Sequence, residues 1–335
     1  MVSASTSKRV LITGAAGQIA YSLIPLVASG QVFGQQTPID LVLLDIPQAQ
    51  KTLSGVAMEI EDCAYPLVQS VLATTELKEA FQGVQVAILV GGFPRGPGME
   101  RKDLMAKNRP IFVAAGQALN DYAAPDCRVL VVANPANTNC AIAAKYAPKL
   151  PKSNFSALTR LDMNRGMGQV AKKLNANANQ IKNVIIWGNH SKTQVPDASQ
   201  AVFTDGSGSQ TPLSKKLDES YFKSEFMTIV QNRGADVIAA RGLSSAMSAA
   251  NAVKDHLRSW LLGTAPGEFV SMAVYTGTSN APYGVASDLF YSLPVTCKDG
   301  NWSVVTGLEI PPYVKEAMKV TEKELLEEKS EAGIA

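Results

Sequence analysis

Histidine and paired cysteine are the scarcest chemical groups in this chain. Its 335 residues include two histidines and four cysteines, and no two cysteines form a C-x-x-C pair. The cysteines lie far apart, three of them among apolar or small residues: Cys63, Cys127, Cys140 and Cys297. We therefore expect reduced, packed thiols rather than a disulfide framework, and no bound metal. A mechanism that uses histidine has two candidates, His190 and His256.

Long charged blocks and long apolar runs are also missing. The 31 basic and 29 acidic residues leave a net charge of +2, which gives no sign of a nucleic acid or an anionic membrane as partner. No apolar stretch reaches the roughly 18–20 residues that span a bilayer. The polar start, "MVSASTSKR", has no signal-peptide core. The expected location is therefore cytoplasmic.

The first half of the chain alternates strand-like and helix-like segments. Expected strands cover residues 9–14, 39–46, 84–92 and 128–135, and expected helices cover 18–30, 52–64 and 102–122. The strands are continuous Val/Ile/Leu runs, which is typical of parallel strands buried on both faces. This order predicts an α/β fold with a Rossmann-type, doubly wound parallel sheet.

The pattern changes near residues 150–158. Beyond it we expect a helix near 162–175, a strand over 183–189, an exposed hairpin or loop over 204–212, a small-residue helix near 234–262 and a charged amphipathic helix at the end. The sequence therefore predicts a Rossmann domain over residues 1–157 and a mixed α+β domain over 158–335; the cofactor and substrate roles of the two domains rest on the residues that follow.

The turn after the first strand contains the glycines of "LITGAAGQIA". Gly14 and Gly17 let the backbone approach a pyrophosphate, and the helix that follows offers N–H groups and the positive end of its dipole. The G-x-G-x-x-G pattern is incomplete because Ile12 occupies its first glycine position. A tight strand–helix turn needs glycine for structural reasons as well, so the turn alone does not decide.

Asp45 supports the dinucleotide interpretation. It ends the second strand, 28 residues after Gly17, where an acidic side chain hydrogen-bonds the ribose hydroxyls of an adenosine. A carboxylate there repels a 2′-phosphate, which favours NAD over NADP. The alternative is a solvated loop aspartate. A Walker-type phosphate loop needs G-K-[ST], and the chain has no such tripeptide.

The candidates for acid/base chemistry lie in "TRLDMNRG" and "IIWGNHS". Asp162 and Arg165 are three residues apart at a helix start, so they project from nearly the same face. An aspartate that accepts the N–H of His190 fixes the imidazole tautomer, and an arginine offers a planar fork to a carboxylate. The alternatives are an ordinary surface ion pair and an unremarkable strand-end histidine.

Six motifs together are familiar: "TGAAGQIAY", "GMERKDL", "NPANTN", "TRLDMNR", "IIWGNHS" and "LSSAMSAA". In this order and at this spacing they resemble the cytosolic-type malate dehydrogenases of the lactate/malate dehydrogenase superfamily, over nearly the whole chain. The resemblance implies an NAD-dependent enzyme that interconverts malate and oxaloacetate and that forms a homodimer.

The resemblance also implies a role for each matching residue. His190 would be the acid/base, and Asp162 would orient it. Arg165 would hold the carboxylate next to the reacting carbon, Arg101 would polarise the carbonyl oxygen, and Asn134 would hydrogen-bond the substrate. NAD would contact Gly14, Ala15, Gly17, Gln18, Ile19, Asp45, Asn108, Asn134, the backbone near Val132, and Ser245 on the small-residue helix.

Arg95 lies in the loop "GGFPRGPGMERKDL", six residues before Arg101. The resemblance makes it the substrate selector, which would pair with the second carboxylate of oxaloacetate. Leaving its charge buried and unpaired against a methyl group costs roughly 3–5 kcal/mol. Two alternatives stay open: a lactate or aromatic 2-hydroxyacid dehydrogenase on the same scaffold, and a catalytically inactive NAD-binding protein.

The chain departs from its relatives at three positions. Gly96 replaces a usual second basic residue, Ala115 a glutamine near the cofactor, and Met163 a common histidine. Each change leaves the catalytic groups in place, and the first two leave room for side activity on other 2-oxo acids.

Overall fold

The computed structural model describes residues 7–94 and 99–334, which form two compact units. Unit 1 comprises Met1–Ala157, Ala246–Arg258 and Glu328–Ala335, and unit 2 comprises Leu158–Ser245 and Ser259–Glu327. Two segments beyond residue 158, Ala246–Arg258 and Glu328–Ala335, therefore belong to unit 1, so the two units are not separated by a single boundary along the chain. The existence of two continuous domains, 1–157 and 158–335, stays a prediction.

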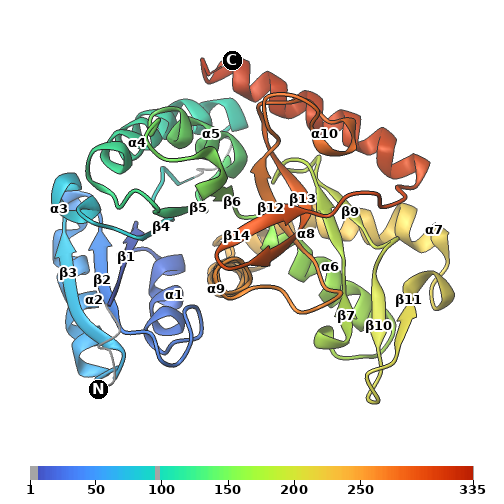
Figure 1. Cartoon of the computed structure of the whole chain (residues 1–335), viewed down its shortest axis with the longest axis horizontal. Coiled ribbons are helices and arrows are strands. Elements are labelled where there is room, and N and C mark those ends of the chain that lie inside the picture. Colours follow the sequence, from blue (N-terminus) through green and yellow to red (C-terminus); the bar gives the residue numbers. More distant parts are fainter. Residues whose placement is uncertain (1–6, 95–98, 335) are drawn as a thin grey trace. The chain divides into compact units, whose positions relative to one another are not determined.

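Unit 1 contains a parallel sheet flanked by helices (Figure 1). Its strands are β1 (Lys8–Thr13), β2 (Ile39–Leu44), β3 (Val68–Thr74), β4 (Val86–Leu89), β5 (Arg128–Val131) and β6 (Phe155–Ala157). Its helices include α1 (Gln18–Ala28), α2 (Gln50–Asp62), α3 (Leu77–Phe81), α4 (Arg101–Tyr122) and α5 (Ala136–Lys145). In Figure 1, α4 and α5 lie side by side in green along these strands.

The strand order in unit 1 explains where its ligand site is expected. The order is β6-β5-β4-β1-β2-β3, and every neighbouring pair is parallel. The chain winds outward from β1 to β3 and then returns to β4 on the other side of β1, so β1 and β4 flank the switch point at which such sheets bind ligands. The four residues of β4 are all buried, as continuous apolar strands require. The expected Rossmann-type fold is confirmed.

Unit 2 is a mixture of helices and short antiparallel strands. Its strands are β7 (Ile181–Lys182), β8 (Ile185–Trp187), β9 (Val195–Asp197), β10 (Val202–Thr204), β11 (Gln210–Pro212), β12 (Val270–Tyr275), β13 (Phe290–Lys298) and β14 (Asn301–Val304). Its helices include α6 (Arg160–Lys173), α7 (Glu219–Tyr221) and α8 (Met227–Arg241). Strand β13 pairs with β12 and β14, and β8 pairs with β9. The expected hairpin over 204–212 is the β10–β11 pair.

One helix expectation is wrong. The small-residue segment 234–262 is two helices, because α8 ends at Arg241 and α9 (Met247–Leu262) begins after a break. Gly242 closes α8 in the left-handed conformation, with φ of +70°, which glycine adopts without a steric penalty. The final helix, α10 (Pro312–Glu331), agrees with the expected amphipathic helix.

Candidate active site

Two glycines meet at the switch point of unit 1. Gly14 follows β1 with φ of +63°, and a Cβ placed on it would lie 2.6 Å from the Cα of Gly91, which follows β4. Real Cβ atoms do not approach a backbone so closely, so the two strand ends can come together only with glycine at these positions. The Gly91 amide also donates to Thr13 Oγ1 at 3.0 Å. The result is a tight turn at the carboxyl end of the sheet.

The start of α1 and the end of β2 complete a surface suited to a dinucleotide. Gly17, the N-cap of α1, carries no side chain to cover the first turn of N–H groups, and Gly17 and Gln18 are both exposed. Asp45 is fixed beside this turn, since its Oδ2 accepts from the Ala16 amide at 2.9 Å and its Oδ1 from the Ile46 amide at 2.8 Å. Each oxygen keeps a further lone pair for a ribose hydroxyl. The residues present fit a pyrophosphate and an adenosine ribose.

The other expected cofactor residues fall into two groups. Asn134 is exposed and Ile19 is half-buried, whereas Ala15 and Val132 are buried. Asn108 is fully buried: its Nδ2 donates to the carbonyls of Leu104 and Asn134, at 3.1 and 3.0 Å.

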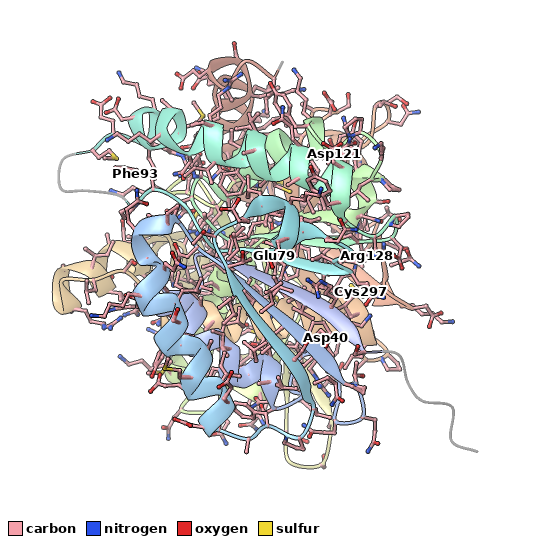
Figure 2. The ribbon with its side chains drawn as sticks, turned by 90° about the vertical axis from the view of Figure 1, so that its left-hand side faces the viewer. Asp40, Glu79, Phe93, Asp121, Arg128 and Cys297 are labelled. Atoms are coloured by element: carbon pink, nitrogen blue, oxygen red, sulfur yellow. The ribbon has the colours of Figure 1, made fainter. Side chains whose placement is uncertain are left out.

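The side-chain oxygen of Asn108 binds the backbone of the segment that follows β4. Its Oδ1 accepts from the Phe93 amide at 2.7 Å, and Figure 2 shows Phe93 close to the start of α4. Lys107 on the same helix lies 4.1 Å from the centre of the Phe93 ring. Asn108 therefore shapes the backbone near the switch point, and a direct contact between its side chain and NAD stays a prediction.

In unit 2, the structure brings Asp162, His190 and Arg165 together. Asp162 Oδ2 lies 2.5 Å from His190 Nδ1, and Arg165 Nη1 donates to Asp162 Oδ1 at 3.1 Å. The Asp162 side chain is fully buried, while those of His190 and Arg165 are 18% and 12% exposed. One buried carboxylate thus bonds two groups that each keep a partly exposed face.

The Asp162 carboxylate stays ionised in this setting. Burial by itself raises its pKa, but the charge and hydrogen bond of His190, the charge of Arg165 and a hydrogen bond from Gln194 outweigh that effect and hold the pKa below its usual value. An ionised carboxylate only accepts hydrogen bonds, so His190 Nδ1 carries the proton. The other ring nitrogen, Nε2, is then the atom that can take a proton.

Ser245 does not lie on a helix, contrary to expectation. It belongs to the break between α8 and α9 and is half-buried. Its Oγ accepts from Arg165 Nη2 at 3.2 Å. Arg165 is therefore held on two sides, by Asp162 and by Ser245, which fixes the plane of its guanidinium.

Of the two arginines after β4 that are expected to bind substrate, Arg101 lies within the described residues. Arg95 and Gly96 lie outside the described residues. Arg101 is the first residue of α4, and its Nε donates to Glu328 Oε1. Thr138 Oγ1 donates to the other oxygen of the same glutamate, whose side chain is 8% exposed.

Sequence reasoning missed Glu328 and Gln194 as neighbours of the expected site residues. Glu328 belongs to a run of charges on an amphipathic helix and contacts Arg101 across 227 positions, so no local pattern could indicate it. Gln194 follows His190 by four residues in "NHSKTQ", and that proximity is the one signal that could have found it.

This geometry defines a class of protein. A dinucleotide turn, a histidine whose tautomer is fixed by an ionised aspartate, and an arginine beside that pair are the parts of a nicotinamide-dependent dehydrogenase. Comparison with known proteins gives the family: residues 8–156 match the lactate/malate dehydrogenase NAD binding domain, and residues 159–333 match the lactate/malate dehydrogenase α/β C-terminal domain. The chain belongs to the lactate/malate dehydrogenase family, and NAD is its cofactor.

Individual relatives are similar over almost their entire length. A protein of Bos taurus named cytoplasmic malate dehydrogenase is 53% identical over 325 residues, which is 97% of this chain and 96% of the relative. The crystal structure of malate dehydrogenase from Naegleria fowleri is 44% identical, with a TM-score of 0.91 and 98% of each chain covered. The Trichomonas vaginalis lactate dehydrogenase in complex with NADH and oxamate is 40% identical, with a TM-score of 0.92 and coverage of 97% and 98%.

Within residues 7–94 and 99–334, no group of three or more His, Cys, Asp or Glu side chains could hold a metal ion. No helix in the same ranges combines the length and apolar character that a membrane span needs.

Proposed function

We propose that this chain is an NAD-dependent malate dehydrogenase that transfers a hydride reversibly between malate and NAD, giving oxaloacetate and NADH. The observation that carries the proposal is the buried, ionised Asp162 bonded to both His190 and Arg165. The 53% identity to a relative with the printed name malate dehydrogenase supports the choice of substrate.

Bound NAD supplies the hydride acceptor, and the protein's own groups handle the proton and the substrate. His190 Nε2 takes the proton of the malate hydroxyl. Asp162 keeps the Nδ1 proton in place and stabilises the imidazolium that forms. Arg165 binds the carboxylate next to the reacting carbon in a bidentate pair, for which its fixed plane prepares it, and Asn134 donates a hydrogen bond to the substrate.

Specificity for a dicarboxylate comes from the loop after β4 in this proposal. Arg95 pairs with the second carboxylate, and Arg101 polarises the carbonyl oxygen of oxaloacetate. These roles are carried over from the family resemblance. In the structure Arg101 pairs with Glu328, so binding the substrate requires Arg101 to exchange or share that partner.

The cofactor contacts follow the same proposal. The residues concerned are Gly14, Ala15, Gly17, Gln18, Ile19, Asp45, Asn108, Val132, Asn134 and Ser245. Asp45 binds the adenosine ribose and excludes a 2′-phosphate, which favours NAD over NADP.

We also propose that the enzyme is a homodimer in the cytoplasm. Large apolar side chains are exposed on α2 and at the start of α9, where Met58 and Met247 are 63% and 80% exposed. The homodimer itself is carried over from the family resemblance, and these side chains offer apolar surface to a second copy. Light scattering coupled to size exclusion tests the dimer, and the location is supported by the printed names of relatives.

A second candidate is a lactate dehydrogenase on the same scaffold. The 40% identity to the Trichomonas vaginalis lactate dehydrogenase favours it, because solved structures of similar identity to this chain include both malate and lactate dehydrogenases. Arg95 argues against it, since a guanidinium left unpaired in a closed site disfavours pyruvate.

The proposal is tested with the His190→Gln variant beside the unaltered protein. The unaltered protein should oxidise NADH with oxaloacetate, and the variant should lose about 10²- to 10⁴-fold in kcat, the usual contribution of a positioned acid/base. The Kd for NADH, measured by fluorescence, should change by less than about twofold because His190 lies outside the NAD binding domain. An unaltered protein without turnover, or a fully active variant, would contradict the proposal.

A further inference from the structure

The loop that carries His190 is bonded to α10 directly before the histidine. The Asn189 amide donates to Thr321 Oγ1 at 2.9 Å, and Asn189 Nδ2 donates to Glu324 Oε2 at 2.8 Å. Thr321 and Glu324 are three residues apart on α10, so they project from the same face of that helix. Both the backbone and the side chain of the residue before His190 are therefore fixed by one helix, drawn in red in Figure 1.

The same helix also fixes the residues directly after the histidine. Ser191 Oγ donates to Glu324 Oε2 at 2.5 Å, and Thr193 Oγ1 lies 2.6 Å from the same oxygen. Thr193 Oγ1 also lies 3.0 Å from Thr321 Oγ1. A single carboxylate oxygen thus gathers three side chains of one short loop, and hydrogen bonds to an ionised acceptor are the strong kind.

Close packing adds to these hydrogen bonds. Gly188 has φ of +88°, and a Cβ placed on it would lie 2.1 Å from Thr321 Cγ2. The Gly188 amide donates to the Ser292 carbonyl at 3.2 Å, and the Ser292 amide donates back at 2.9 Å. The loop therefore begins between β13 on one side and α10 on the other.

Ser292 ties this loop to the helix that bears Asp162. Its Oγ lies 2.8 Å from Oγ1 of Thr159, the N-cap residue of α6. Ser292 on β13 thus contacts both segments that carry the Asp162–His190 pair, the start of α6 and the loop after Gly188. Thr321 and Glu324 on α10 hold the loop from a second side.

We propose that Glu324 and Thr321 are positioning residues for the reaction, which hold loop 188–193 so that His190 Nδ1 stays bonded to Asp162 Oδ2. The inference rests on the proposed function in that it takes His190 as the acid/base. They act through Asn189 and Ser191 rather than on the substrate. Small displacements of a reacting group cost about 10²-fold in rate, so a loop released from α10 loses turnover.

The test compares substitutions on one helix. Glu324→Gln keeps the shape but replaces an ionised acceptor with a neutral amide. Glu327→Gln is the matched control, because Glu327 is 61% exposed on the same helix, 3.8 Å from Lys323, and undergoes the same change of charge. Thr321→Val removes the hydroxyl that accepts from Asn189, while Thr321→Ser retains it.

Two readouts separate positioning from general stability. We expect Glu324→Gln and Thr321→Val to lower kcat about 10- to 100-fold, with KM for NADH changed by less than about twofold. Thr321→Ser and Glu327→Gln should stay within about threefold of the unaltered protein. The chain has two histidines, so its imidazole NMR spectrum has two sets of signals, of which the His190 set is assigned by its loss in His190→Gln. The His190 signals should move in Glu324→Gln while those of His256 stay.

Several outcomes would overturn the inference. These are a kcat for Glu324→Gln within threefold of Glu327→Gln, His190 signals that do not move, or signals that move without loss of kcat. If Glu324→Gln does not fold, the Thr321 pair decides: equal kcat values for Val and Ser overturn it. Failure of the proposed function is distinguishable, because an unaltered protein without oxaloacetate turnover contradicts that function, whereas the NMR comparison still reports on the loop.

Discussion

At the scale of single residues, the charge of the Asp162 carboxylate depends on its neighbours. Its side chain is fully buried, and burial alone raises a carboxyl pKa. His190 and Arg165 reverse that effect by pairing with opposite oxygens of the carboxylate. The ionised state therefore stabilises the folded protein.

Replacing Asp162 should destabilise the protein in a pH-dependent manner. The folded-state pKa of Asp162 is lowered, so its contribution to stability is fully present above the unfolded value of about 3.9 and is lost as pH falls through the lower, folded value. At pH 7, Asp162→Asn should cost about 3 kcal/mol, because it leaves the largely buried Arg165 without its charged partner. Urea unfolding at pH 7 and near pH 3 measures this; a difference between the two proteins that does not shrink in acid contradicts it.

Asp45 should govern the choice between NAD and NADP. Asp45→Asn removes the negative charge that repels a 2′-phosphate, so kcat/KM for NADPH relative to NADH should rise about tenfold, or about 1.4 kcal/mol. Asp40→Asn is the matched control: Asp40 (labelled in Figure 2) lies near the start of β2, where Ser70 Oγ donates to it at 2.5 Å, whereas Asp45 follows the end of that strand. An unchanged cofactor ratio in Asp45→Asn shows that this carboxylate does not select NAD.

At the scale of elements, the apolar parallel strands β1, β2, β4 and β5 were predictable, whereas the antiparallel strands β12 and β13 were not. Strands β1, β2, β4 and β5 are continuous apolar runs, because both faces of a parallel sheet are covered. Strands β12 and β13 mix apolar and polar residues without a regular two-residue alternation, and β13 also includes Pro294, which is unusual within a strand. The long small-residue helix was predicted without its break, because a single glycine within a run of small residues is tolerated in a helix and does not by itself mark the end that Gly242 forms.

The contacts of α10 could not be predicted from the sequence. Glu324 and Glu328 have the spacing of an ordinary charged helix face, and their partners lie more than 130 positions away. The group of Asp162, Arg165 and His190 was predictable for two reasons. Asp162 and Arg165 are three residues apart on a helix, and a histidine that acts as acid/base needs a carboxylate partner. Long-range partners without a motif require the folded structure.

Glu328 should anchor the end of α10 in unit 1. Its carboxylate accepts from Arg101 and Thr138, and nearby Arg109 Nε donates to the Ala332 carbonyl at 2.8 Å. Glu328→Gln should destabilise the protein by about 1–2 kcal/mol, with the partial exposure of Arg101 keeping the loss below that of a fully buried pair.

Calorimetry of Glu328→Gln beside Glu327→Gln measures this difference. The exposed Glu327 should contribute less than about 1 kcal/mol. Equal melting temperatures for the two variants would show that the buried glutamate does not anchor the helix.

At the scale of the whole molecule, the chemistry is divided between two parts of the chain. Residues 8–156 match an NAD binding domain and contain Gly14 and Asp45, while residues 159–333 match the C-terminal domain of the same family and contain Asp162, His190 and Arg165. Cofactor affinity and acid/base chemistry should therefore respond to different substitutions. The similarity to relatives covers 97–98% of the chain and therefore both parts.

The most direct test of malate dehydrogenase activity compares 2-oxo acids at pH 7 in NADH oxidation by the unaltered protein. The measured quantity is kcat/KM for oxaloacetate, pyruvate and phenylpyruvate. We expect a preference for oxaloacetate of about 10²- to 10⁴-fold, the equivalent of the 3–5 kcal/mol that an unpaired buried charge costs. Equal or higher kcat/KM with pyruvate or phenylpyruvate would contradict the malate assignment and favour the second candidate.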